Sequence, residues 1–223
     1  MKTAIWLSFA VFIFLLVIFP LGFGQLLAVS LAKLHLDRTA ALWLITGIIG
    51  GSFVNIPVRR IHRHQAILVR PLGVLPISVP TPAMSRYQTI VAVNVGGCVI
   101  PIGLALYELG LLAAGLDAGL LASIVLACAI NVAICYRMAR PISGVGIAMP
   151  GLVSPLVAAV LALALAPEQA PPFAFIVGVM GPLIGADLFH LKDLEDTMSV
   201  VSIGGAGTFD GIVLSGIIAA YLA

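Results

Sequence analysis

Charged residues are scarce in this sequence. Only 9% of its 223 residues are Asp, Glu, Lys or Arg, whereas 61% are hydrophobic. Soluble globular chains carry about 25% charged residues, so this chain has too few to cover a surface that faces water. The scarcity excludes a soluble enzyme, and a net charge of +2 gives no reason to expect a nucleic-acid partner. We therefore expect a multi-pass protein of the cell membrane, with lipids as its general partners.

Cysteine is also scarce. The three cysteines lie in apolar stretches, without the spacing of a zinc site, and their odd number does not suggest a disulfide framework. We expect them to pack as small apolar residues. The sequence contains no phosphate-binding loop and no zinc-protease motif, so we expect neither a cofactor nor a metal.

Long apolar stretches predict an all-α transmembrane bundle of about seven helices, forming a single domain over residues 1–223. A helix that crosses the membrane needs about 20 apolar residues. The first stretch is long enough for one bent span, a span with a half-helix, or a cleaved signal sequence. The stretches cover approximately 4–31, 39–57, 88–113, 117–138, 145–166, 171–190 and 206–223.

The positive charges predict an orientation. Nine of the 11 Lys and Arg residues fall in the N-terminus and in the loops after the second, fourth and sixth spans. Because Lys and Arg accumulate on the cytoplasmic side, we expect a cytoplasmic N-terminus and an external C-terminus. The largest loop, 58–87, is basic and rich in proline. Its β-prone residues predict an extended edge strand or a hairpin, since proline is confined to the edges and turns of sheets.

Two carboxylates remain inside the predicted spans, Asp187 and Asp210. Ionisable groups within a membrane are costly and are therefore functional candidates. The last two spans form a predicted hairpin over 171–223, in which Asp187 lies near the end of one helix and Asp210 about four residues inside the next. Two facing carboxylates share one proton, so one can activate water while the other polarises a carbonyl. The pair predicts the catalytic residues of a peptide hydrolase.

Small residues surround both aspartates. Those near Asp210 are expected to let a substrate backbone come close, and Gly185 lies four residues after Gly181, a spacing that brings helices together. The expected substrate-binding positions are Gly185, Gly204, Gly205, Gly207, Thr208 and Gly211.

Asp210 lies in a span with a glycine-rich start, and the preceding span contains Asp187. This pattern resembles the intramembrane aspartyl proteases of the presenilin and signal-peptide-peptidase type. Those proteases carry Tyr-Asp on one helix and Gly-x-Gly-Asp on the next. The resemblance implies that Asp187 and Asp210 are the catalytic pair and that the substrate is a membrane-embedded peptide. Here Asp187 follows Ala186, Asp210 follows Gly207 by three residues, and no proline follows Asp210.

A second resemblance covers nearly the whole chain. It rests on four segments, Asn55-Ile56-Pro57, Asn94-Val95-Gly96-Gly97, Gly185-Ala186-Asp187-Leu188 and Ser202 through Gly211. These segments are similar to those of a prokaryotic integral-membrane family known only as a domain of unknown function. This resemblance implies a membrane architecture and no particular activity.

Two other functions stay open. Asn94 and Pro101 in the third span, and Pro150 and Pro155 in the fifth, are typical of the interrupted helices that bind ions in transporters. Both Asn55 and Asn94 are polar intramembrane candidates, and an ion-coupled transporter or channel could use the same two aspartates. A non-catalytic scaffold, in which the aspartates cap helix ends, is the third possibility.

A weak internal repeat aligns the segment 144–162 with the segment 205–223 without a gap. It pairs Ser154 with Ser215, and the matched spans are expected to point the same way across the membrane. Met149 takes the position equivalent to Asp210, so the carboxylate itself is not repeated.

Overall fold

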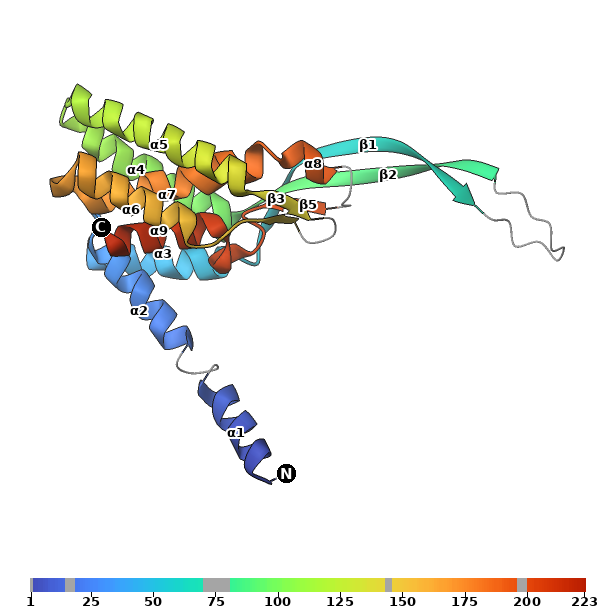
Figure 1. The fold of residues 1–223 in the computed structure, drawn as a ribbon, viewed down its shortest axis with the longest axis horizontal. Coiled ribbons are helices and arrows are strands. Elements are labelled where there is room, and N and C mark those ends of the chain that lie inside the picture. Colours follow the sequence, from blue (N-terminus) through green and yellow to red (C-terminus); the bar gives the residue numbers. More distant parts are fainter. Residues whose placement is uncertain (1, 15–18, 70–80, 143–145, 196–199) are drawn as a thin grey trace.

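Figure 1 shows the chain as a computed structural model, which describes residues 2–14, 19–69, 81–142, 146–195 and 200–223. Most of these residues are helical, and the strands gather at one end of the helices. The α-helices are α1 (Lys2–Ile13), α2 (Phe19–Ala32), α3 (Arg38–Gly51), α4 (Ile100–Ala114), α5 (Ala118–Met138), α6 (Val153–Leu165), α7 (Ala170–Met180), α8 (Leu191–Glu195) and α9 (Gly211–Leu222).

Shorter elements join these helices. Two π-helical segments, η2 (Val95–Val99) and η4 (Gly181–Leu188), continue directly into α4 and from α7. Two 3-10 turns are η3 (Pro167–Gln169) and η5 (Gly207–Phe209). The strands are β1 (Asn55–Val69), β2 (Thr81–Asn94), β3 (Arg140–Ile142), β4 (Gly146–Ala148) and β5 (Val200–Ile203).

Within the described residues, three helical segments are long and apolar enough to cross a membrane, so the seven spans expected are not confirmed. They are Val95–Ala114, Ala118–Met138 and Pro167–Leu188, and three shorter apolar helices accompany them in the described part of the chain. Three of the expected spans are shorter than the roughly 20 residues that a crossing needs, because α3, α6 and α9 have only 14, 13 and 12 residues. Hydropathy also does not separate buried strands from helices. Residues 88–94 were expected to begin a span but belong to strand β2.

The extended segment is a two-stranded ribbon that projects away from the helices (Figure 1). Strands β1 and β2 pair antiparallel from Asn55 opposite Asn94 out to Val69 opposite Thr81. The ribbon therefore begins before the predicted loop 58–87 and ends after it, while residues 70–80 at its far end lie outside the described residues. Strand β5 pairs in parallel with the base of β2, which gives the sheet the order β1-β2-β5.

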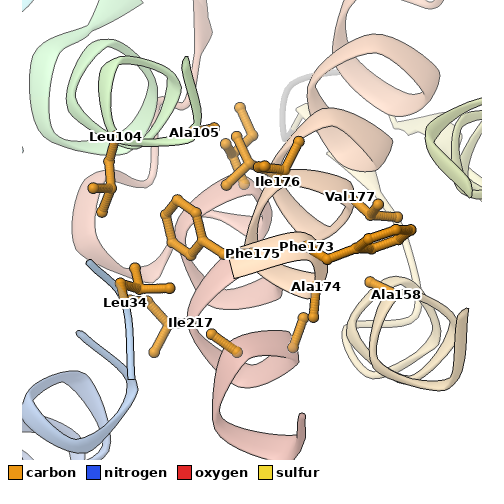
Figure 2. Packing of buried hydrophobic residues seen from close by; sticks show 14 of the residues in the cluster. Leu34, Leu104, Ala105, Ala158, Phe173, Ala174, Phe175, Ile176, Val177 and Ile217 are labelled. Carbon is orange, nitrogen blue, oxygen red and sulfur yellow. The ribbon is translucent and has the colours of Figure 1, made fainter. Parts of the chain in front are cut away.

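Helix α7 forms the centre of the bundle. Its side chains Phe173, Phe175 and Val177 are at most 2% exposed, and Figure 2 shows them packed among residues of the neighbouring helices, including Leu104 and Ile217. Burying side chains of this size contributes about 1.5–3 kcal/mol each when the alternative is water. In lipid this gain is absent, so close packing and polar contacts between helices carry more of the stability.

One such set of polar contacts joins four helices at the centre of the bundle. The Asn131 amide on α5 donates to the Ser154 hydroxyl on α6 at 3.0 Å and to the Val177 carbonyl on α7 at 2.9 Å. The Ser154 hydroxyl also bonds the Ser215 hydroxyl on α9 at 2.6 Å. Ser154 and Ser215 occupy equivalent positions of the internal repeat, so the repeat brings its own equivalent residues together.

A second polar contact fixes the turn between α2 and α3. Glu108 on α4 is fully buried, and its carboxylate accepts the His35 backbone N–H at 3.1 Å. The His35 ring Nδ1 lies 2.8 Å from the same carboxylate. Tyr107 donates its hydroxyl to the His35 carbonyl at 3.3 Å, so α4 holds this turn through both the backbone and the side chain of His35.

We predict that Ser215→Ala destabilises the bundle, because it removes one hydroxyl from the buried contact with Ser154. Hydrogen bonds between membrane helices contribute about 0.6 kcal/mol on average and about 1.7 at most, and the loss should fall in this range. Thermal unfolding in detergent micelles measures it. Ser123→Ala is the matched control, since the Ser123 hydroxyl bonds Gly119 of its own helix. Equal effects of the two variants would contradict the prediction.

Candidate functional site

Asp187 lies one residue before the end of the π-helical segment η4. This segment packs closely on α5, where a Cβ added at Gly185 would meet the Val132 carbonyl, and one at Gly181 would meet the Asn131 side chain. π-helical turns inside helices occur frequently at functional sites. The Asp187 carboxylate is half-buried, and its Oδ2 accepts the Gly204 N–H at 3.4 Å.

Asp210 lies at the start of α9 as its N-cap residue, with extended backbone. Its Oδ1 accepts the Ile212 N–H at 3.0 Å, and its Oδ2 accepts the Ala206 N–H at 3.3 Å. Burial raises the pKa of the Asp210 carboxyl, while these two N–H donors oppose the shift. The prediction that Asp210 lies four residues inside a helix is wrong, because Gly211 begins the helix.

The two aspartates meet at a pair of cavities. The first, the strand-side cavity of about 310 Å³, lies between strands β4 and β5. The second, the helix-side cavity of about 350 Å³, is lined by residues of η4, η5, α9 and the segment before α6. Asp187 and Asp210 both line each cavity. The carboxylates therefore share one site at the base of the ribbon.

The loop between β5 and α9, residues 204–210, is fixed by hydroxyl groups on both sides. The Ser52 hydroxyl lies 2.7 Å from that of Thr208. The Ser202 hydroxyl donates to the Asn55 side-chain oxygen at 2.6 Å. These contacts tie the loop that carries Asp210 to the end of α3 and to the first residue of the ribbon.

Asn94 connects the other strand of the ribbon to the same region. Its side-chain oxygen accepts the Gly97 N–H at 2.8 Å, which caps η2. Its amide nitrogen donates to the Ser52 carbonyl at 2.8 Å and to the Asn55 side chain at 3.1 Å. The polar groups of Asn94 are thus engaged in holding the fold. From the sequence alone, Ser52 was not identified as a residue of this region. The available signal was a polar residue three positions before Asn55 within an apolar stretch.

The glycines bring this loop close to the helices. A Cβ added at Gly97 would meet the Gly204 carbonyl, and Gly204 has a φ of +70° that favours glycine. Gly207 has a φ of +63° and packs against Ser52. Four of the six expected substrate-binding positions, Gly185, Gly204, Gly207 and Thr208, therefore act in packing, while Gly205 lines the strand-side cavity and Gly211 the helix-side cavity.

The prolines expected to interrupt spans lie at helix starts. Pro101 occupies the first turn of α4, and Pro155 the first turn of α6. Pro150 precedes α6. A proline in the first helical turn costs no hydrogen bond, so Pro155 leaves α6 regular, whereas Pro101 directly follows the π-helical segment η2 within the continuous helical segment Val95–Ala114. Within the described residues, no three or more His, Cys, Asp and Glu side chains gather as a metal site requires.

Residues 49–222 match a family described as a protein of unknown function, DUF1614. The match covers well over half of the chain, so the chain belongs to this family. No curated protein and no solved structure matches this chain. The resemblance to a family of unknown function is thereby confirmed, whereas these comparisons do not support the resemblance to presenilin-type proteases.

We predict that Gly204→Ala disrupts the site, because a Cβ there would lie 2.6 Å from the Gly97 carbonyl carbon and 2.7 Å from the Cys98 Cβ. Overpacking of this kind costs about 1–3 kcal/mol, and the left-handed φ adds to the cost. Gly103→Ala on α4 is the control, since open space surrounds it and alanine favours a helix by about 0.5–1 kcal/mol. Thermal unfolding should separate the two variants in opposite directions, and a Gly204→Ala protein as stable as the wild type would contradict the packing described.

Proposed function

We propose that this member of the DUF1614 family is an aspartyl-type hydrolase that cleaves membrane-embedded peptides, with Asp187 and Asp210 as its acid–base pair. One observation carries the proposal: both carboxylates line the same two cavities, although they are separated in sequence by a loop, a short helix and a strand. A general acid and a general base must both lie within reach of one substrate group, directly or through one water. Cavities shared by two carboxylates provide such a place.

The surroundings assign the roles. Asp210 accepts two backbone N–H groups and lies at a helix N-terminus, where a negative charge is stabilised. Asp187 accepts one N–H at the longer distance of 3.4 Å. Asp210 is therefore the ionised base and Asp187 the protonated acid at the start of the reaction.

The reaction then proceeds in two balanced steps. Asp210 takes a proton from water as the water oxygen bonds to the peptide carbonyl carbon, and Asp187 gives its proton to the carbonyl oxygen. In the second step Asp210 returns its proton to the peptide nitrogen as the C–N bond breaks. One hydroxyl of the diol passes its proton to Asp187, which leaves a carboxylic acid, an amine and the starting protonation of both residues.

The strand-side cavity suggests how a peptide is held. Gly146 and Ile147 of β4 line it on one side, and the four residues of β5 line it on the other. The strands β4 and β5 pair with β3 and β2 respectively. An extended peptide between them could bond to the open edge of β5, which is a common mode of peptide binding. In this proposal a peptide bond lies beside both carboxylates, and the substrate has to be unwound locally.

Ion-coupled transport by the same carboxylates is the second candidate. The open cavities favour it, since hydrated carboxylates can bind a proton or a cation. The packed side chains of α7, including Phe173 and Phe175, fill the bundle beyond the site, which favours hydrolysis over transport. A scaffold with no activity would explain the helix cap at Asp210 but not a second carboxylate in the same cavities.

The proposal also includes the orientation read from the charges. The exposed residues Arg59 and Arg60 lie on the part of β1 that pairs with the base of β2, and this part of β2 pairs with β5, which lines a cavity together with both aspartates. Positive residues favour the cytoplasmic side. The site therefore faces the cytoplasmic half of the membrane, with a cytoplasmic N-terminus and with Ala223 toward the external side.

Cleavage assays test the activity. We expect the purified full-length protein in lipid vesicles to cleave apolar transmembrane peptides, and Asp187→Asn and Asp210→Asn each to lower the rate at least about 100-fold, as loss of general acid–base catalysis does. Asp193→Asn, an exposed carboxylate on α8, is the matched control and should retain the wild-type rate. Mass spectrometry of the products measures each rate.

Two results would contradict the hydrolase. One is cleavage that persists in both asparagine variants, which would indicate a contaminating protease. The other is a wild-type protein that cleaves none of a broad set of transmembrane peptides but carries protons or cations across the vesicle membrane. If this transport depends on Asp187 and Asp210, the result would favour the transporter.

Cysteine labelling in intact cells tests the orientation. Leu116, in the turn between α4 and α5, is 88% exposed, and Lys192 on α8 is exposed at the opposite end of the bundle. We expect Leu116→Cys to react with a membrane-impermeant maleimide from outside, and Lys192→Cys to react only after permeabilisation. The reverse pattern would overturn the orientation. The wild-type protein provides the background, because its three cysteines are buried or half-buried.

A further inference from the structure

The helix-side cavity has one polar wall and one apolar wall. The carboxylates of Asp187 and Asp210 form the polar part, while Met149, Phe209 and Leu214 contribute large apolar side chains. The strand-side cavity, by contrast, is lined largely by strand residues and small residues. The two aspartates therefore lie at the junction between a cavity shaped for an extended backbone and a cavity with an apolar wall.

The apolar wall has a fixed position. Phe209 is 54% exposed, and its ring lies 5.1 Å from the ring of Phe23 on α2. The two rings are tilted by 37° to each other, and aromatic pairs at this distance attract each other. Because Phe209 immediately precedes Asp210, an apolar group that contacts its ring lies within one residue of the Asp210 carboxylate.

The internal repeat relates two residues that line the helix-side cavity, Met149 and Asp210. Ser154 and Ser215, equivalent in the repeat, meet through a hydrogen bond of 2.6 Å. Met149 and Asp210 are equivalent in the same alignment, and both line the helix-side cavity. The position that holds a carboxylate in one repeat thus holds a thioether in the other. Methionine is flexible and polarisable, and it adapts to apolar groups of different shape.

We infer that the helix-side cavity is a side-chain pocket that selects a large apolar residue next to the cleaved bond of the peptide, with Met149 and Phe209 as its specificity-determining residues. This inference rests on the proposed hydrolysis at Asp187 and Asp210. The cavity of about 350 Å³ lies at the small end of the range of ligand pockets, about 300–1,000 Å³, which suits one side chain. An apolar pocket discriminates by about 10–200-fold for each methylene that it holds.

The test compares two peptides that differ at one position. Each is a short apolar peptide in which one peptide bond is replaced by a non-cleavable reduced amide, with Phe or Ala as the residue before that bond. In a second pair of peptides, Phe or Ala is the residue after the reduced bond. Both pairs are needed because the lining of the cavity does not show in which direction the peptide chain runs past Asp210. Binding to the full-length protein in detergent micelles is measured by calorimetry, so that the readout does not depend on turnover.

For one of the two pairs we expect the wild type to bind the Phe peptide at least about ten-fold more tightly than the Ala peptide. Met149→Trp fills the cavity, so it should lower the affinity for the Phe peptide at least ten-fold and change the affinity for the Ala peptide less than about three-fold. Met138→Trp is the control. Met138 is 38% exposed on α5 and lies outside the lining of the helix-side cavity, so this variant should preserve the preference.

The outcomes separate this inference from the proposed activity. A Phe preference that is absent in the wild type, or unchanged in Met149→Trp, overturns the pocket whether or not the protein cleaves peptides. Conversely, a preference that Met149→Trp abolishes supports the pocket even if Asp187→Asn and Asp210→Asn have no effect on cleavage, a result that would reject only the hydrolase. Retained binding of the Ala peptide shows that the Met149→Trp protein is folded.

Discussion

The contact between the backbones at Gly97 and Gly204 is the constraint on which the site depends. Without side chains at these positions, the loop after β5 packs directly on the start of α4. From this position the Gly204 N–H reaches Asp187, and the chain turns after only a few residues to place Asp210 at the start of α9. A side chain at either glycine would separate the loop from the helix, and the two carboxylates would no longer share their cavities.

The polar side chains at the base of the ribbon reinforce the same contact. Asn94 caps the π-helical segment that presents Gly97, and Asn55 accepts the hydroxyl of Ser202 just before Gly204. Inside a membrane such groups must be satisfied within the protein, because an unpaired polar group costs several kcal/mol there. Hydrogen bonds connect the side chains at the ribbon base into one cluster, and that cluster joins the ribbon to the site. A displacement of the ribbon base would reach the Asp187–Asp210 pair through two hydrogen bonds.

From the sequence, it was easier to predict that the segments with Asp187 and Asp210 meet than to predict which residues of these and neighbouring segments form strands or helices. Asp187 and Asp210 stood out because they are carboxylates within apolar stretches, and the succession of two such stretches was enough to expect them at one end. It did not reveal that β5 separates them or that β2 extends to Asn94, because Val, Ile and Ala in 89–93 suit a buried strand and a membrane helix equally. The long-range contact between Ser52 and Thr208 leaves no periodic pattern at all, so only the folded chain could show it.

At Asp210, capping of helix α9 is compatible with the proposed role as a general base, and the cap is a condition for that role. An ionised carboxylate has about four sites that accept hydrogen bonds, and the N–H groups of Ile212 and Ala206 occupy one on each oxygen. Each oxygen keeps a further site for a group in the cavities that Asp210 lines. The same two bonds prevent rotation of the carboxylate, so that it is held in position before any substrate arrives. A residue that only capped the helix would need no such cavity, and a free carboxylate in the cavity would lack a fixed direction.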